Sequence, residues 1–208
     1  MQPIRAVIFD FGNVLYNQPN INWVRRWRKF LRWKDDGSAE DLMARPEKSE
    51  FIMNVMLGKV PESELWNELA RKWKMSALTV RLLQKSAVNR FRLNKTLIEF
   101  ARALRPAHLV SILSNAGSDL RKNYIQPYGF EDWMDDIVIS AEVGLVKPDA
   151  AIYQLALERL KLTAEQAVFV DDLAENVEAA RQAGLHAVHH TGNRATLSAL
   201  TALLAQAG

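Results

Sequence analysis

The chain has 208 residues, 49% hydrophobic and 25% charged, which fits a globular protein with a sizeable core and excludes disordered, collagen-like and Gly/Pro-rich linker proteins. Its 27 lysines and arginines against 24 aspartates and glutamates leave a net charge of +3, too small to indicate nucleic-acid binding by itself. With no cysteine in the chain, disulfide bonds, thiolate metal sites and cysteine nucleophiles are also excluded.

The N-terminal stretch MQPIRAVIFDFGNVL has only a short apolar run, which Asp10 interrupts, so we expect no signal peptide. No run of about 18 apolar residues occurs in the sequence, so we expect no membrane-spanning helix. The lack of cysteine fits a reducing compartment. We therefore predict a cytoplasmic location.

The first predicted element is a buried parallel strand at Ala6–Phe9. Its sequence AVIF is short and apolar on both faces, and it ends abruptly at Asp10 with Gly12 close behind. Residues 17–91 follow, with helical patterns and no convincing strand. The helices predicted there are Trp23–Trp33, Ala39–Met43, Glu47–Leu57, Glu62–Trp73 and Ala77–Val88.

From residue 92 onward, helices alternate with short apolar runs that pass into polar residues. The predicted strands are Leu109–Leu113, Ile137–Ile139, Ala167–Val170 and His186–His189. The predicted helices are Lys95–Leu104, Ala150–Leu160 and Glu175–Ala183, the last followed by Gly184 as a stop signal. Thr163 and Gln166 have the spacing of a capping box before the fourth strand.

This alternation predicts an α/β fold, with a three-layer Rossmann-like core around a parallel sheet. A crossover between parallel strands needs about a dozen residues or somewhat more. The much longer first connection therefore predicts an inserted, all-helical cap subdomain at 17–91, with the α/β core formed by 1–16 and 92–208. The first strand is expected to be central, so that Asp10 faces both Ser114 and Asp172.

Ligands of open parallel sheets bind beyond the carboxyl ends of the strands. The polar residues expected at that edge are Asp10, Ser114, Asn115, Asp171 and Asp172, with Lys147 in the loop after the third strand. Carboxylates and water suit Mg²⁺, and a bound Mg²⁺ would hold an anion. The lysine, the serine hydroxyl and backbone amides could complete a phosphate cradle.

Four stretches resemble, in order, the motifs of the haloacid dehalogenase (HAD) superfamily, subfamily IA, which has a helical cap after the first strand. AVIFDFGNV resembles the motif with the nucleophilic Asp, and LVSILSN the motif that ends in Ser or Thr. VGLVKPDAAIY resembles the Lys-Pro motif, and VFVDDLAENVEAARQAGLHAV the motif with the metal-binding acid. The match covers 1–16 and 92–208, whereas the cap matches in position and helicity only.

The resemblance implies that Asp10 attacks phosphorus and forms an aspartyl-phosphate, which splits one hard displacement into two easier ones. It also implies that the Ser114 hydroxyl and the Asn115 backbone amide bind phosphoryl oxygens. We expect Asn13 to bind the substrate as well. Lys147 would offset the charge of Asp10 and the phosphate and stabilise the transition state.

The implied cofactor is Mg²⁺, held by Asp10, Asp172 and the backbone carbonyl of Gly12. Asp171 stands where Gly is frequent, and we expect it to contact the residues that bind the metal, or the metal through a water molecule, and not to bind the metal directly. Asn176 stands where many relatives have a second acid, and we expect it to orient the lysine or a metal-bound water. The implied partner is a small phosphorylated metabolite, and the protein is expected to be a monomer or homodimer.

One residue departs from the resemblance. Gly12 replaces the second Asp that serves as general acid and base in most phosphatases of the superfamily, a role worth about 10² to 10⁴ in rate. Slow catalysis, a replacement acid and lost activity all stay open. The DxGNV form resembles bacterial sugar-phosphate phosphatases such as α-glucose-1-phosphatases, whose glycosyl leaving groups need an acid less. A glycine here is also expected to permit a positive φ.

Two other functions stay open beside phosphate hydrolysis. A metal-free haloacid dehalogenase, in which Asp10 attacks carbon, is allowed by Gly12, but the acid pair Asp171-Asp172 would have no use there. A degenerate fold kept as a binding module is supported only by Gly12. Dependence on Mg²⁺ would separate the phosphatase from the dehalogenase.

The stretch Trp23–Lys34 interleaves aromatic and basic residues, as segments that bind nucleic acid do. Its apolar residues recur at the spacing of one buried helical stripe, so an amphipathic helix is expected and nucleic acid is not. The histidines His186, His189 and His190 invite a zinc site, but their spacing to the acids resembles none.

Overall fold

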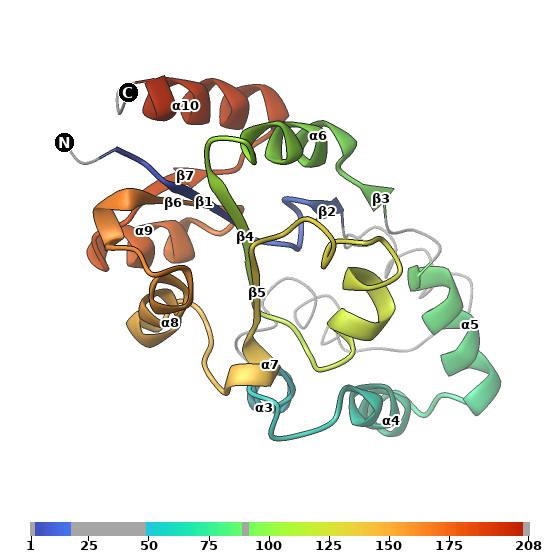
Figure 1. Ribbon diagram of the computed structural model, residues 1–208. Coiled ribbons are helices and arrows are strands. Elements are labelled where there is room, and N and C mark those ends of the chain that lie inside the picture. Colours follow the sequence, from blue (N-terminus) through green and yellow to red (C-terminus); the bar gives the residue numbers. More distant parts are fainter. Residues whose placement is uncertain (1–2, 18–48, 89–91, 206–208) are drawn as a thin grey trace.

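The computed structural model describes residues 3–17, 49–88 and 92–205. At its centre is a five-stranded parallel sheet in the order β5-β4-β1-β6-β7 (Figure 1). The strands are β1 (Ala6–Phe9), β4 (Leu109–Ser114), β5 (Asp136–Ile139), β6 (Ala167–Asp171) and β7 (His186–His189). The five predicted strands and the central place of β1 are confirmed.

Helices cover both faces of the sheet (Figure 1). They are α6 (Lys95–Leu104) and α10 (Asn193–Ala205) on one face, and α8 (Ala150–Leu160) and α9 (Ala174–Gln182) on the other. Val7 and Phe9 of β1 belong to the apolar cluster on the side of α6, whereas Ala6 and Ile8 belong to the cluster on the side of α8. This alternation confirms the predicted three-layer α/β architecture.

Capping residues mark the first or last turn of several of these helices. The side chains of Asn94 and Asp149 accept backbone hydrogen bonds at the N-termini of α6 and α8. The capping box of Thr163 and Gln166 is present before β6, as its spacing predicts. Gly184, two residues after the end of α9, has a φ of 91°, a conformation that favours glycine at a helix end.

Four helical elements of the core carried no prediction. They are the π-helical turn Arg121–Ile125, α7 (Ser140–Val143), the 3-10 turn Ala164–Gln166 and α10. The first three are too short to show a helical period in sequence. Two of them matter for the site, because α7 begins where β5 ends and the π-helical turn follows the loop after β4.

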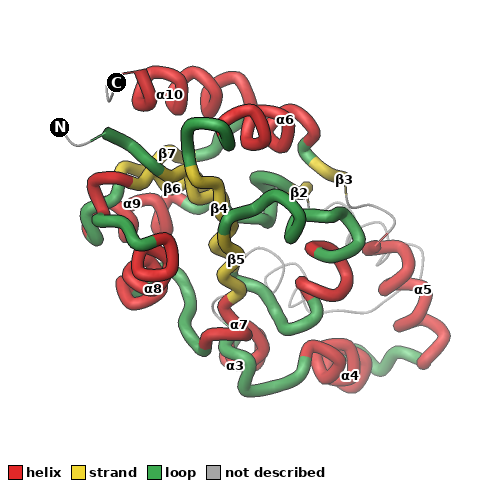
Figure 2. The backbone as a smooth tube through the Cα atoms, in the orientation of Figure 1, coloured by secondary structure: helices red, strands yellow, loops and turns green. Residues whose placement is uncertain are grey.

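Between β1 and α6, the described residues 49–88 form helices and loops without a strand (Figure 2). The helices are α3 (Glu50–Met56), α4 (Glu62–Lys72) and α5 (Ala77–Val88), close to the predicted bounds. The helices predicted at Trp23–Trp33 and Ala39–Met43 lie outside the described residues, so the limits of the cap subdomain stay a prediction. None of the helices in the described part of the chain is long and apolar enough to cross a membrane.

A small two-stranded sheet was not predicted. β2 (Tyr16–Asn17) pairs antiparallel with β3 (Arg92–Leu93), so the chain segments that lead out of the core and back into it lie side by side. Asn94 follows β3, and its side-chain amide donates to the carbonyl of Val14 at 2.8 Å and to Asn193 Oδ1 at 2.7 Å. These two hydrogen bonds of Asn94 connect the loop after β1 to the start of α10.

Candidate functional site

Asp10 stands at the carboxyl end of the central strand. Its backbone N–H donates to the carbonyl of Val170 at 2.8 Å, so the pairing of β1 with β6 continues one residue beyond β1. The residue is 7% exposed. The sheet itself therefore holds this carboxylate next to the end of β6.

Lys147 bridges the two strand ends from the loop after α7. Its ammonium donates to Asp10 Oδ1 at 2.7 Å, to Asp171 Oδ2 at 2.7 Å and to the carbonyl of Leu113 at 3.0 Å. An ammonium group has three protons, so each has a partner. The lysine is 3% exposed, and such a buried cation is held in one place between its two carboxylates.

Asp171 is fully buried, and its carboxylate already accepts several hydrogen bonds. Asn176 Nδ2 donates to both of its oxygens at 3.1 Å, the backbone N–H of Leu173 donates to Oδ1 at 2.8 Å, and Lys147 donates to Oδ2. A carboxylate offers about four lone-pair sites. Asp171 is therefore occupied as an acceptor, and its effect is to hold the lysine in position.

The neighbouring Asp172 differs in exposure and in bonding. It is only partly buried, and its Oδ2 accepts a side-chain hydrogen bond from Asn13 Nδ2 at 3.0 Å. Of the two adjacent acids, Asp172 thus has the oxygen atoms that a cation or its water could reach.

The acids of the site fit a hard cation. One carboxylate oxygen from each of Asp10, Asp171 and Asp172 lies within 4.8 Å of the others, and this is the one such cluster of histidine and acidic residues among the described residues. Oxygen donors of this kind suit Mg²⁺. The Oδ1 atom of Asn176 is buried without a hydrogen-bond partner. This orphaned acceptor could accept a hydrogen bond from a metal-bound water.

The charges of the site are unbalanced. Burial raises the pKa of the Asp10 carboxyl to about 7; Lys147 opposes the shift, and Asp171 and Asp172 add to it. Burial likewise raises the pKa of Asp172, against the hydrogen bond from Asn13. Burial alone would lower the pKa of Lys147, but attraction to Asp10 and Asp171 leaves it raised. One cation among three acids leaves an excess of negative charge that a metal ion would neutralise.

The loop after β4 is tied to the same centre. Ser114 ends the strand and is 4% exposed. The side-chain amide of Asn115 donates to the carbonyl of Lys147 at 2.8 Å, and its oxygen accepts from the backbone N–H of the lysine at 2.8 Å. Sequence reasoning assigned only a backbone role to Asn115. In the structure its side chain also fixes the segment that carries the lysine.

Ser140 and Tyr153 are two supporting residues that sequence reasoning missed. Ser140 Oγ accepts from the backbone N–H of Ala116 at 2.9 Å and donates to its carbonyl at 3.1 Å. The Tyr153 hydroxyl donates to the carbonyl of Asn176 at 2.9 Å. Ser140 had a signal, since it is the polar residue at the end of the third predicted strand, whereas a tyrosine on an apolar helix face gave none.

The turn after Asp10 differs from expectation. The positive φ of this turn, 55°, is at Asn13, and Gly12 does not have one, so the backbone expected for Gly12 is wrong. Asn and Asp tolerate this conformation better than most residues. The Asn13 side chain donates to Asp172 Oδ2, and its predicted contact with substrate stays a prediction.

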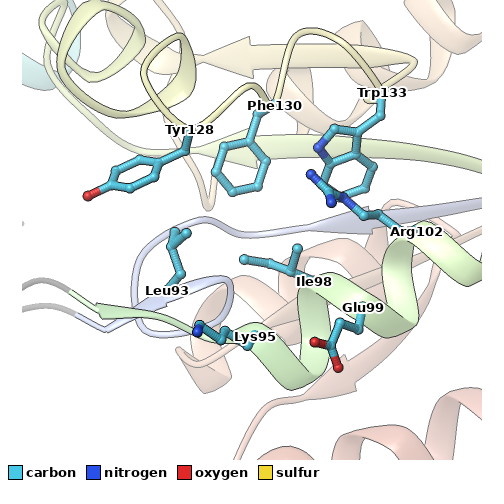
Figure 3. Close-up of a pocket in the computed structure, with 8 residues that line it drawn as sticks. All are labelled: Leu93, Lys95, Ile98, Glu99, Arg102, Tyr128, Phe130 and Trp133. Carbon is cyan, nitrogen blue, oxygen red and sulfur yellow. The ribbon is translucent and has the colours of Figure 1, made fainter.

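A pocket of about 180 Å³ lies away from the acidic cluster (Figure 3). Tyr128, Phe130 and Trp133 line one side, and residues of β3 and α6 line the other, with the Arg102 guanidinium 4.9 Å from the centre of the Trp133 ring. Phe130 also packs edge-on against Phe11, which follows the site aspartate. None of the predicted site residues lines this pocket.

Two relatives are much longer than this chain. Drimenol cyclase drtB of Aspergillus calidoustus is 28% identical over 89% of this chain, which covers 34% of that protein. Acyl-CoA dehydrogenase family member 10 of Mus musculus is 39% identical over 96% of this chain, which covers 19% of it. The chain therefore spans about a third or less of the length of these two relatives.

Two relatives of similar length carry enzyme names. The Phosphorylated carbohydrates phosphatase of Thermotoga maritima is 39% identical and matches 89% of this chain and 84% of its own. The (S)-2-haloacid dehalogenase 2 of a Pseudomonas species is 24% identical and matches 96% of this chain and 89% of its own.

Solved structures share the fold. An HAD-like family hydrolase of Porphyromonas gingivalis has a TM-score of 0.76 and 22% identity, over 97% of this chain and 98% of its own. An HAD family enzyme of Bacteroides thetaiotaomicron, in complex with magnesium and inorganic phosphate, has a TM-score of 0.71 and 19% identity, over 89% and 93% of the two chains.

The family comparison covers the whole site. The model of the haloacid dehalogenase-like hydrolases matches residues 4–184, a stretch that includes Asp10, Lys147 and both acids at the end of β6. The chain therefore belongs to the haloacid dehalogenase-like hydrolase family.

Proposed function

We propose that the protein is a Mg²⁺-dependent phosphatase that hydrolyses a small phosphorylated metabolite through an aspartyl-phosphate on Asp10. The observation that carries the proposal is the position of Lys147 between two buried carboxylates, with the more exposed Asp172 beside them. Such a centre brings a nucleophile, a fixed cation and a carboxylate that can bind a metal ion to one edge of the sheet. The Thermotoga relative named as a phosphatase supports the same chemistry.

We assign the metal to Asp10, Asp172 and the backbone carbonyl of Gly12. Asp171 is left out of this set, because its oxygens already accept hydrogen bonds from the lysine, from Asn176 and from a backbone amide. A bound Mg²⁺ would supply positive charge to offset that of the nucleophile and the phosphoryl group. The Bacteroides neighbour, which has the same fold, is a complex with magnesium and inorganic phosphate, and this supports Mg²⁺ as the ion.

In the first step, a carboxylate oxygen of Asp10 forms a bond to phosphorus while the bond from phosphorus to the ester oxygen breaks. The leaving alkoxide takes a proton from solvent water and departs as an alcohol, and the proton that the attacking water loses in the second step returns to the solvent. In the second step, water attacks the phosphorus of the aspartyl-phosphate, which releases inorganic phosphate and restores the Asp10 carboxylate. Lys147 donates to Asp10 Oδ1 and fixes its orientation, and its charge stabilises the transition state.

A sugar phosphate is our favoured substrate. Gly12 leaves the loop after β1 without the carboxyl group that would protonate a poor leaving group. A glycosyl phosphate has a better leaving group than a simple alkyl phosphate, so its hydrolysis needs that proton less. The name of the Thermotoga relative, which matches most of this chain, is in keeping with a carbohydrate substrate.

Gly12 also favours a second candidate function, a metal-free dehalogenase, which the Pseudomonas relative represents. In that reaction Asp10 attacks the carbon that bears the halogen, halide leaves, and water then hydrolyses the ester on Asp10. The negative cluster around Asp172 argues against it, because a reaction that releases an anion gains nothing from an additional acid beside the nucleophile.

The deciding experiment measures phosphate release from a panel of phosphorylated metabolites and halide release from 2-haloacids, each with Mg²⁺ and with EDTA. We expect phosphate release that requires Mg²⁺, with glycosyl phosphates among the fastest substrates. Asp10→Asn is the control, since its amide is nearly isosteric and a poor nucleophile. Halide release that EDTA leaves unchanged would favour the dehalogenase, and no release of either kind would favour a binding module.

A further inference from the structure

The helical segment 49–88 touches the catalytic edge at the first residue of α4. Glu62 Oε2 accepts a hydrogen bond from the backbone N–H of Asp119 at 3.3 Å. Asp119 lies between β4 and the π-helical turn, in the loop that begins with Asn115. One side chain of the helical segment therefore bonds to the backbone of the loop that we assign to the phosphoryl group.

Gly117 makes this contact possible through its lack of a side chain. A Cβ atom built on Gly117 would lie 2.4 Å from Glu62 Oε2 and 3.0 Å from its Cδ. Gly117 does not have a positive φ, so the position calls for space and not for an unusual backbone. The loop and the Glu62 carboxylate are thus packed directly against each other.

The Glu62 carboxylate is partly withdrawn from water at this contact. Burial raises its pKa, and the Asp119 carboxylate adds to the shift, while the hydrogen bond from the Asp119 backbone opposes it. The Glu62 carboxylate also helps to raise the pKa of Tyr124, in which burial is the larger cause, to about 12. Because desolvating an acid is unfavourable, the backbone hydrogen bond is the compensation that holds Glu62 there.

The opposite side of the same loop is tied to the core. The Asn115 side chain bonds to the backbone of Lys147, and Ser140 Oγ bonds to both backbone groups of Ala116. The loop that follows Ser114 is therefore held by the core at its first residues and by Glu62 at Asp119.

We propose that Glu62 is a positioning residue of the helical segment, which sets the loop after Ser114 for phosphoryl binding, and that Gly117 is the space it needs. This inference rests on the proposed phosphatase function. It assigns the effect to binding of the phosphoryl group, which all substrates and inorganic phosphate share, and not to recognition of the leaving group.

The test uses the full chain with Mg²⁺, p-nitrophenyl phosphate as substrate and inorganic phosphate as inhibitor. The variants are Glu62→Ala, Glu62→Gln, Gly117→Ala and the double variant of Glu62→Ala with Gly117→Ala. The matched control is Glu64→Ala, because Glu64 lies on the same turn of α4 and bonds to Asn67 of its own helix instead of the core. Urea unfolding of each variant reports the folded fraction.

We expect Glu62→Ala and Gly117→Ala each to raise KM and the inhibition constant of phosphate together, by about tenfold, the effect of a lost hydrogen bond and a displaced loop. Glu62→Gln should stay within about threefold, since its amide oxygen accepts the same bond. The control should match the wild type. The double variant should be no worse than either single variant, because each removes the same contact.

A fall in kcat with unchanged KM and unchanged phosphate inhibition would show a purely structural role and overturn the inference. So would a control as impaired as Glu62→Ala, or a double variant with the product of the two single effects. In these outcomes the wild type remains a phosphatase, so the proposed function stands. A wild type that releases no phosphate from any compound overturns the proposed function, and the inference with it.

Discussion

The carboxyl edge of the sheet and the helical segment 49–88 are built in opposite ways. Every residue of β1 and β6 is buried, and their ends carry the site acids directly. In the segment 49–86, by contrast, Val55 and Leu83 are the buried hydrophobic residues among those described, and α4 buries none. The buried sheet therefore fixes the site acids, whereas α4 has no buried residue to hold it in place.

The ion pairs of the two regions show the same contrast. Lys147 pairs with Asp10 and Asp171 with both partners almost fully buried. Arg71 on α4 pairs with Glu68 at 2.8 Å, with 70% and 36% of their side-chain surfaces exposed. Exposed pairs contribute little to stability, while a buried charge that loses its partner is very costly. The contrast implies that equivalent substitutions will have unequal effects in the two regions.

The largest effect is expected at the edge of the sheet, in Asp10, the nucleophile that we propose. Asp10→Asn should lower kcat by about 10⁴-fold or more, as loss of a nucleophile does, and the protein should remain folded. Beryllium fluoride should form an adduct on the wild-type Asp10 and none on the variant, and mass spectrometry under native conditions would detect it. Retention of most of the activity in Asp10→Asn would contradict covalent catalysis.

Removal of the buried cation should come next. Lys147→Met leaves two buried carboxylates without their cation, and we expect the free energy of unfolding to fall by about 3–5 kcal/mol in urea titrations. The matched substitution on α4, Arg71→Met, should change it by at most about 0.5 kcal/mol. Equal losses in the two variants would break the comparison between the regions.

The missing carboxyl group at Gly12 should make the rate depend on the leaving group. Aryl and glycosyl phosphates should be hydrolysed much faster than simple alkyl phosphates, which need a proton from a general acid. Gly12→Asp should raise the rate for alkyl phosphates by up to about 10²-fold and leave aryl phosphates nearly unchanged. If rates plotted against leaving-group pKa gave a flat line, another group would already supply the proton.

The raised pKa of Asp10 predicts a gradual effect of pH on stability in the absence of metal. The folded protein keeps this carboxyl protonated up to about pH 7, whereas the unfolded chain loses the proton near its ordinary value of 3.8. The free energy of unfolding should therefore fall as pH rises between these values, by at most about 1.4 kcal/mol per pH unit. Urea titrations in EDTA should show a shallower slope for Asp10→Asn, and identical slopes would contradict the shift.

Much of the core could be predicted because parallel strands leave a plain signal. Ala6–Phe9 and Ala167–Val170 are buried on both faces, so they read as continuous apolar runs that stop where the acids begin. Their shared edge then follows from strand direction alone, and strand direction is enough to predict that Asp10 and Asp172 lie together, as they do.

The supporting contacts could not be predicted, because they join residues far apart in sequence through hydrogen bonds that leave no periodic pattern. Asn115 offers its side chain to the backbone of Lys147, and Glu62 reaches Asp119 from a different region of the chain. The backbone of Gly12 was predicted wrongly, because the left-handed residue of the turn is its neighbour Asn13. Glycine permits a positive φ but does not require one.

The pairing of β2 with β3 has a consequence for how such a protein can change over evolution. Tyr16 and Leu93 are cross-strand neighbours, so the chain leaves the core and returns to it at two adjacent positions. Changes of chain length between these two strands therefore need not shift the register of the five parallel strands. A lineage can thus vary the segment between β2 and β3 while the strands that carry the site acids stay in register, as long as the contact of Glu62 with the loop after Ser114 is kept.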